Sequence, residues 1–252
     1  PTPHTSSAAS DVYKRQIRFS VTLLSKFKPS LRMNDFPTWS FRRKALSVLA
    51  TFGKKTLRVC RSEDGGKTWG EPIRIAESGI HGGGTTVDEN TGDILVFVED
   101  EHPPAPLTVY RSQDDGKTWL VDNVIIHSDS EGREVSMHMN EHGITLRHGQ
   151  HKGRLLRPSR HYGEGNRPKS LFPTHFTNAI YSDDGGKTWK ASDPFPHMGT
   201  GEAAVAELSD GRIYYNSRRH WAPENVDSRR RWIAWSDDAV SYTHLRAHET
   251  DT

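Results

Sequence analysis

One eight-residue pattern, Ser-x-Asp-x-Gly-x-Thr-Trp, occurs three times in the chain and begins a fourth time. The complete copies occupy residues 62–69, 112–119 and 182–189, and a shortened copy follows at 236–238. Successive copies start about 50 to 70 positions apart, the scale at which one repeat builds one four-stranded unit of a β-propeller. The spacing therefore predicts an all-β fold made of stacked, similar sheets.

The residues around each copy fit a strand followed by a tight turn. Alternating β-branched or aromatic residues precede the copies at 56–60, 107–110, 178–181 and 232–235. Within a copy, the Asp side chain can accept hydrogen bonds from backbone amides, and the Gly can adopt the positive φ that such a turn requires. We therefore expect these aspartates, Asp64, Asp114 and Asp184, to hold turns, and the Trp rings to pack beneath the hairpins.

Further strand pairs, each separated by polar turn residues, lie between the copies. The pairs are 85–87 with 94–98, 143–146 with 154–157, and 203–208 with 212–215. Together with the strands that flank the repeats, they indicate about three to four blades of four strands each. Residues 17–239 contain no ten-residue amphipathic helix pattern, which agrees with an all-β chain.

The bulk composition excludes several classes of protein. With 33% apolar residues, 26% charged residues and 21 glycines, the chain fits a turn-rich globular domain. The net charge of +2 gives no reason to expect nucleic acid or an anionic membrane as a partner. No apolar run approaches the roughly 20 residues of a membrane helix. The single cysteine, Cys60, excludes an internal disulfide, and the 14 histidines show no metal-ligand spacing, so we expect neither metal nor cofactor.

Both ends of the chain look like translated library adapter rather than natural protein. Residues 11–16 can be encoded as GAT GTG TAT AAG AGA CAG, and the reverse complement of that DNA encodes Val-Ser-Tyr-Thr-His, which stands at 240–244. We therefore interpret residues 1–16 and 240–252 as additions and exclude them from fold reasoning.

The remaining residues divide into two parts. Residues 17–55 lack a clear strand pattern, and we interpret them as a degraded first blade or as unrelated sequence. Residues 56–239 are predicted to form a partial propeller.

The repeat resembles the Asp-box, also called the bacterial neuraminidase repeat, of the sialidase (neuraminidase) family. The resemblance covers roughly residues 56–238 and implies a six-bladed sialidase-type propeller, here incomplete. Asp-boxes also occur in sortilin-like receptors and other propellers that are not sialidases. The repeat therefore predicts the fold more strongly than the activity, and the function has to rest on other residues.

Residues 201–218 resemble the sialidase segment in which a glutamate opens one strand and an arginine ends the next. The resemblance implies that Glu202 polarises a nucleophilic tyrosine and that Arg218 belongs to an arginine triad that grips the substrate carboxylate. A guanidinium binds a carboxylate through two parallel, charge-assisted hydrogen bonds. Sialidases use tyrosine where most glycosidases use a carboxylate nucleophile. A one-residue change of register would put Arg219 in place of Arg218.

Two weaker resemblances add expected substrate contacts. Residues 133–146 are similar to a substrate-contacting stretch of animal cytosolic sialidases, which implies that Glu134 lies near the polar groups of the sugar. Residues 158–162 match the start of a loop that covers the glycerol-like tail of sialic acid, which implies contacts from Arg160 and Tyr162. The alternatives are a rim salt bridge for Glu134, and surface exposure or ordinary packing for the other two.

The other groups of the sialidase site are not identified in this sequence. Residues 17–55 contain no Arg-Ile-Pro stretch that would supply the first arginine, and no acid aspartate precedes the first repeat. The third arginine and the tyrosine are expected beyond residue 239. We therefore expect this chain by itself to be inactive.

Taken with the resemblance, these residues predict a parent protein that is an exo-α-sialidase. It would hydrolyse terminal sialic acids from glycoconjugates with retention, so its partner is a sialylated glycan or another acidic sugar. Two alternatives stay open: a non-catalytic Asp-box propeller that binds glycan or protein, and a related hydrolase or lyase of a different acidic sugar. Many members of the family are exported, which favours a secreted or periplasmic location.

Overall fold

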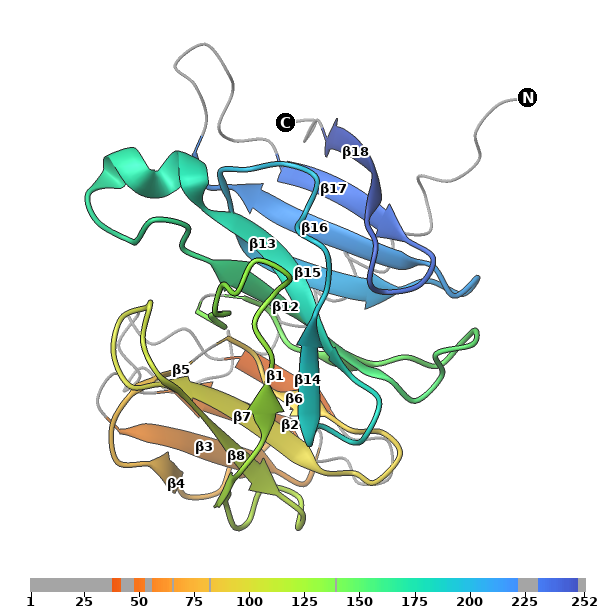
Figure 1. Ribbon diagram of the computed structural model, residues 1–252. Coiled ribbons are helices and arrows are strands. Elements are labelled where there is room, and N and C mark those ends of the chain that lie inside the picture. Colours follow the sequence, from red (N-terminus) through yellow and green to blue (C-terminus); the bar gives the residue numbers. More distant parts are fainter. Residues whose placement is uncertain are drawn as a thin grey trace.

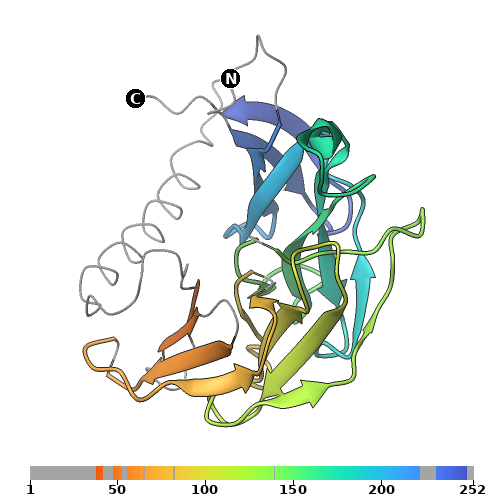
Figure 2. The same ribbon diagram turned by 90° about the vertical axis from the view of Figure 1, so that its left-hand side faces the viewer.

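The computed structural model describes residues 38–41, 48–52, 56–64, 66–81, 83–138, 140–221 and 231–248. These residues form four sheets and one short 3-10 helix, η1 (Lys169–Thr174). Figure 2 shows the sheets following one another along an arc, as blades of a propeller do. The predicted all-β, incomplete propeller is confirmed. Within the described residues, no helix is long and apolar enough to cross a membrane.

Each sheet is built mainly from consecutive antiparallel strands (Figure 1). The first blade contains β1 (Thr38–Phe41), β2 (Val48–Phe52), β3 (Leu57–Ser62) and β4 (Ile73–Ala76). The second blade contains β5 (Ile80–His81), β6 (Thr86–Val87), β7 (Ile94–Glu99), β8 (Leu107–Ser112) and β9 (Leu120–Asp122). The third contains β11 (Ile144–Thr145), β12 (Leu155–His161), β13 (Phe176–Ser182) and β14 (Thr188–Ala191), with β10 (Ile125–Ile126) parallel to β14. The fourth contains β15 (Thr200–Glu207), β16 (Ile213–Arg219), β17 (Arg231–Ser236) and β18 (Thr243–His248).

Two of these blades extend beyond residues 56–239, the part that the sequence predicted to form the propeller. Strands β1 and β2 lie within 17–55 and pair in register with β3, so this segment supplies two strands of the first blade. Strand β18 lies within 240–252 and pairs with β17. The adapter origin of the two ends stays a prediction, and residues 1–16 lie outside the described residues.

Each repeat connects the third and fourth strands of its blade, and its aspartate organises the turn. In the second blade, Asp114 Oδ1 accepts backbone hydrogen bonds from Lys117 (3.1 Å) and Thr118 (2.8 Å). The Ser112 hydroxyl donates to Oδ1 (2.9 Å) and the Thr118 hydroxyl to Oδ2 (2.7 Å). Slight burial raises the pKa of Asp114, but these hydrogen bonds outweigh it and lower the pKa to about 2. The predicted turn role is confirmed, and Asp64 and Asp184 bind their turns in the same way.

The fourth, shortened copy also closes into a turn. Asp238 Oδ1 accepts hydrogen bonds from the backbone of Val240 and Ser241 (2.8 Å each), and the Ser241 hydroxyl donates to Oδ2 (2.5 Å). The turn is one residue shorter than in the other blades, and Tyr242 follows it where they carry Trp. The Tyr242 ring is buried and packs edge-on against Tyr215 (5.1 Å between centroids). The turn therefore forms without the Gly and Trp of the repeat.

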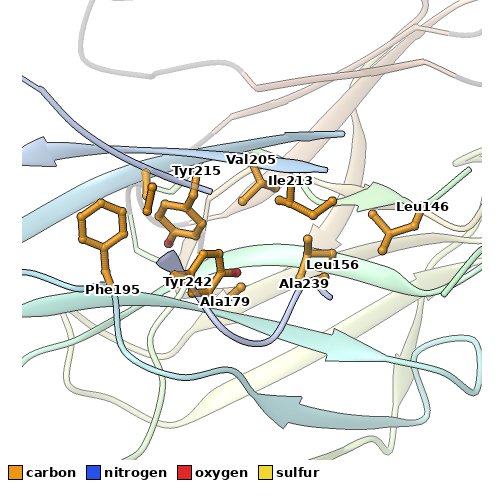
Figure 3. Close-up of a cluster of buried hydrophobic side chains, with 11 residues drawn as sticks. Leu146, Leu156, Ala179, Phe195, Val205, Ile213, Tyr215, Ala239 and Tyr242 are labelled. Carbon is orange, nitrogen blue, oxygen red and sulfur yellow. The ribbon is translucent and has the colours of Figure 1, made fainter. Parts of the chain in front are cut away.

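The hydrophobic core lies between successive blades rather than in one central mass. Strand β7 shows this directly, because Ile94, Val96 and Val98 pack toward the first blade while Leu95 and Phe97 pack toward the third. Successive strand residues point to opposite faces, so a strand covered on both sides needs an unbroken apolar run. The third and fourth blades share a third cluster, shown in Figure 3.

Arginines also connect each blade to the turn of the next blade. Arg61 Nε donates to the carbonyl of Asp115 (2.6 Å), and Arg111 Nη2 donates to the carbonyl of Gly185 (2.9 Å). Arg154 of the third blade donates through Nη1 to the carbonyl of Asp238 in the fourth turn (3.1 Å). The turns are therefore fixed both from within and by the preceding blade.

The first strands of the blades lie next to one another around the inside of the arc. Strand β1 contacts β6, β6 contacts β11, and β11 contacts β15. A bridge between Thr86 and Gly143 joins the second and third blades at this level. Two hydrogen bonds at Ala203 join the third and fourth blades. Glu141 N donates to the Ala203 carbonyl (2.8 Å), and Ala203 N donates to Asn140 Oδ1 (3.1 Å). The start of β15 is thereby held at the inner edge of the propeller.

Candidate active site

A β-bulge at the start of β15 sets the geometry of the candidate site. Thr200 pairs with Arg219, but Ala203 pairs with Ser217, so β15 carries one extra residue here. Gly201 and Glu202 together oppose the single remaining residue of β16. Bulges bend a strand and re-aim its side chains, and they are frequent beside active sites.

The bulge brings the two residues with the strongest predicted roles into direct contact. Arg218 Nη1 lies 2.8 Å from Glu202 Oε1 and 3.0 Å from Oε2, so one end of the guanidinium spans the carboxylate. The side chain of Arg218 is 52% exposed and that of Glu202 is 17% exposed. The pair is therefore open to solvent on the arginine side, where a ligand anion can approach.

Arg219, the alternative considered from the sequence, faces the other way. Its side chain is buried, and its guanidinium lies 4.2 Å above the ring of Trp232. Neighbouring strand residues point to opposite faces, so the two arginines cannot both meet Glu202. The structure thus joins Glu202 to Arg218 and not to Arg219.

A second arginine, Arg160 of β12, lies buried close to this pair. Its Nη2 donates to His175 Nδ1 (2.8 Å), whose Nε2 donates to the Gly165 carbonyl (2.8 Å), so His175 is a neutral imidazole. The guanidinium lies 4.5 Å from the ring centroid of Tyr162. Burial lowers the pKa of Arg160, while the negative charge of Glu202 raises it. Arg160 therefore adds positive charge beneath the Glu202–Arg218 pair.

Tyr162, predicted to contact substrate, is buried beside Arg160. Burial raises its pKa to about 12, and the nearby arginine opposes that shift only in part. Its phenol therefore stays protonated at neutral pH. In this environment Tyr162 supports Arg160 and is poorly suited to act as a nucleophile.

Glu99, which the sequence analysis did not single out, lies at the end of β7 beneath the same region. The carboxylate is fully buried, and its Oε1 accepts hydrogen bonds from the Ser136 hydroxyl (2.5 Å) and from Met137 N (3.1 Å). Burial raises its pKa to about 7, opposed by these bonds and by Arg157 and Arg160. The sequence does contain a sign of this buried carboxylate, because Glu99 is the one charged residue of the otherwise apolar strand sequence ILVFVE.

Glu134 lines a groove that includes neither Glu202 nor Arg218. It is exposed and lines a groove of about 410 Å³ together with Leu107, Val109, Val121 and Val124, at the outer strands of the second blade. No hydrogen bond or ion pair among the described residues joins it to Glu202 or Arg218. Of the five predicted site residues, the structure therefore gathers Glu202, Arg218, Arg160 and Tyr162 and leaves Glu134 apart. The described residues contain no group of three side chains able to hold a metal ion.

Blades closed by Asp-box turns around a charged inner edge define a sialidase-type propeller, a fold shared with several glycosidases. By sequence, the chain is related to sialidases. Over 190 residues it is 29% identical to a sialidase of Micromonospora viridifaciens, a match covering 66% of this chain and 28% of that protein. Over 198 residues it is 27% identical to a sialidase of Bacteroides fragilis strain YCH46, covering 64% and 33% respectively. No protein-family profile matches the chain.

Solved structures support the fold. The Hadza microbial sialidase Hz136 matches with a TM-score of 0.62 at 22% identity, over 85% of this chain and 46% of that one. An alpha-L-arabinofuranosidase from Fusarium graminearum matches with a TM-score of 0.55 at 14% identity, over 87% and 67%. The chain spans a third or less of the curated sialidases that it resembles.

Proposed function

We propose that this chain forms part of an exo-α-sialidase that releases terminal sialic acids from glycoconjugates with retention. The observation that carries the proposal is the Glu202–Arg218 pair, aligned by a bulge at the inner edge of the propeller and open to solvent at the guanidinium. Sequence identity to two bacterial sialidases supports the same assignment.

In this proposal Arg218 binds the carboxylate of the sugar. Its exposed N–H groups can form the charge-assisted bonds that fix both the position and the orientation of a carboxylate. Only Nη1 of Arg218 contacts Glu202, so its other N–H groups are available to a ligand carboxylate while Glu202 stays in place. The Glu202 carboxylate can then accept the proton of a tyrosine nucleophile, the role that the resemblance implies.

Arg160 and Tyr162 act behind this pair. The buried Arg160 adds a positive field that favours an anionic ligand, because charges interact more strongly away from water. Its guanidinium is held by His175 and by the ring of Tyr162, so it is fixed before a ligand arrives. A fixed cation binds an anion without first losing side-chain freedom.

The chain by itself is expected to bind an acidic sugar but not to hydrolyse it. Of the six groups that the sialidase resemblance requires, this chain has two identified ones, Glu202 and Arg218. We expect no release of the fluorophore from a fluorogenic sialoside by the purified chain. Robust turnover would refute this assignment of the missing groups.

Binding provides the direct test of the site. The inhibitor DANA, present in a solved Trypanosoma rangeli sialidase complex, is a suitable probe, and saturation-transfer NMR can follow weak binding. We expect Arg218→Met to abolish the signal. Arg212→Met is the matched control, because Arg212 also belongs to the β16 region and forms an exposed ion pair, with Asp210. Equal binding by the Arg218→Met variant and the unsubstituted chain would overturn the proposal.

A further inference from the structure

His220 lies directly beside the Glu202–Arg218 pair, just after the end of β16. Its backbone N–H donates to the Gly199 carbonyl (2.8 Å), which holds it against the start of β15. Its side chain occupies the space that a side chain at Gly201 would need, since a Cβ there would lie 2.8 Å from His220 Cβ and 3.3 Å from Nδ1. The absence of a side chain at residue 201 thus lets an imidazole lie next to Glu202.

Aromatic rings hold the His220 imidazole in place but leave its nitrogens free. The ring stacks on His175 (5.6 Å between centroids, 13° between planes) and contacts Phe172 (4.4 Å). Both ring nitrogens are buried, and within the described part of the chain neither has a hydrogen-bond partner. Buried polar atoms without partners cost free energy, so such atoms point to a missing partner.

The imidazole of His220 is uncharged under ordinary conditions. Burial lowers its pKa most, Arg160 lowers it further, and Glu202 opposes them, with a result of about 4. The other groups facing the ring are Arg218 and His175, which also lower the pKa. A neutral imidazole offers one N–H donor and one acceptor nitrogen.

His138 is a second histidine whose imidazole lies near Glu202 and Arg160. Its loop is fixed to β15 at Ala203, the residue after Glu202: Ala203 N donates to Asn140 Oδ1, and Glu141 N donates to the Ala203 carbonyl. Its buried Nδ1 has no partner among the described residues, and its ring lies 4.9 Å from that of His102. Burial first, then His102 and Arg160, lower its pKa to about 4, opposed by Glu202.

We propose that His138 and His220 recognise uncharged hydroxyl groups of the acidic sugar whose carboxylate Arg218 holds. A hydroxyl group donates one hydrogen bond and accepts others, which matches a neutral imidazole. Arg218 and Arg160 supply the positive charge that attracts the carboxylate. The neutral imidazoles beside them can therefore distinguish between anionic ligands that carry hydroxyl groups and those that do not. This inference rests on the proposed function and extends it to the substrate class that the site selects.

Two probes separate the hydroxyl contacts from the charge contact. N-acetylneuraminic acid carries both a carboxylate and hydroxyl groups, whereas cyclohexanecarboxylate carries only the carboxylate. We expect His220→Phe, which keeps a ring for stacking, to raise the Kd for the sugar about tenfold, since losing a partner for buried polar groups costs that much or more. The Kd for cyclohexanecarboxylate should stay within about twofold, because its carboxylate contacts do not involve the imidazole.

Three further variants complete the test. His138→Phe should change the selectivity in the same direction, and His220→Gln, which keeps a donor and an acceptor, should recover part of it. His197→Phe is the control, because His197 also stacks on an aromatic ring, that of Trp232 (4.4 Å), but its Nδ1 already has a partner, Met198.

The outcomes distinguish this inference from the proposed function. If His220→Phe and His138→Phe leave the selectivity between the two probes unchanged, the inference is overturned while the proposed function stands. If the unsubstituted chain binds neither probe, the proposed function fails and the inference fails with it. Loss of both probes in Arg218→Met, together with loss of selectivity in the histidine variants, supports both.

Discussion

The contact between the second and third blades at Gly143 leads to a sharp prediction about stability. A Cβ at Gly143 would lie 2.3 Å from Thr86 Oγ1, 2.8 Å from Thr86 Cγ2 and 2.9 Å from Arg157 Cβ. Thr86 and Arg157 are both fully buried, so neither can move into solvent. Carbon atoms in contact normally stay at least about 3.5 Å apart, so Gly143→Ala must push the inner strands apart by about 1 Å.

Two costs follow from that displacement. Overpacking of a buried site costs about 1–3 kcal/mol. The movement also disrupts the hydrogen bond from Arg157 Nη1 to Thr86 Oγ1 (3.2 Å), and losing a bond to a buried charged group costs a further ~1–3 kcal/mol. We therefore expect Gly143→Ala to lower the free energy of unfolding by about 2–6 kcal/mol, a large part of the ~5–15 kcal/mol typical of a domain.

Urea unfolding followed by tryptophan fluorescence measures this loss. Gly70→Ala is the control, because the nearest atom to a Cβ there is the Arg61 carbonyl oxygen at 3.6 Å, an ordinary contact. That variant should stay within about 0.5 kcal/mol of the unsubstituted chain. Adding Thr86→Ala to Gly143→Ala removes the two nearest of the three close atoms, Thr86 Oγ1 and Cγ2, and should recover part of the loss. A Gly143→Ala variant as stable as the Gly70→Ala control would refute the steric argument.

Two further predictions concern the turns. Arg111→Met removes ion pairs to Asp93 and Asp122 and the bond to the Gly185 carbonyl, and should cost ~3–5 kcal/mol, because partners of a mostly buried charge are left unpaired. Arg74→Met, which removes an exposed pair with Glu77, should cost less than ~1 kcal/mol in the same urea experiment. The pKa of Asp114 is about 2 in the folded chain, below the ~4 of an unfolded aspartate, so its stabilisation is present above about pH 4 and is lost as the pH falls toward 2. Asp114→Asn should flatten the pH dependence of the unfolding free energy in that range, and an unchanged slope would contradict the turn assignment.

The repeated features of the fold were predictable because each carries a local signal. Strand β8 has alternating β-branched and aromatic residues, and the turn after it combines an aspartate with a glycine at the required spacing. Strands β1 and β2 were not predicted, because their residues lack such alternation and their place is set by pairing with β3. The parallel pairing of β10 with β14 likewise depends on a long-range contact.

The candidate site was predictable only in part, for a similar reason. The sequence indicated that Glu202 opens one strand and that Arg218 ends the next. Which of Arg218 and Arg219 meets Glu202, however, depends on the β-bulge in the pairing of β15 with β16. His138 and His220 carried no local signal, because their properties arise from burial and from Arg160, which lies on another strand, β12. Side-chain chemistry was visible in the sequence, whereas its electrostatic surroundings arose from tertiary packing.

The arginine links between blades run in one direction along the chain. Arg61 reaches forward to the second turn, Arg111 to the third and Arg154 to the fourth. Each of these arginines also pairs with a carboxylate of its own blade: Arg61 with Glu63, Arg111 with Asp93 and Asp122, and Arg154 with Asp183. Each arginine is therefore positioned on its own blade and contacts the next one as well. Because the acceptors are backbone carbonyls, each link depends on where the following turn lies and not on which side chain that turn carries.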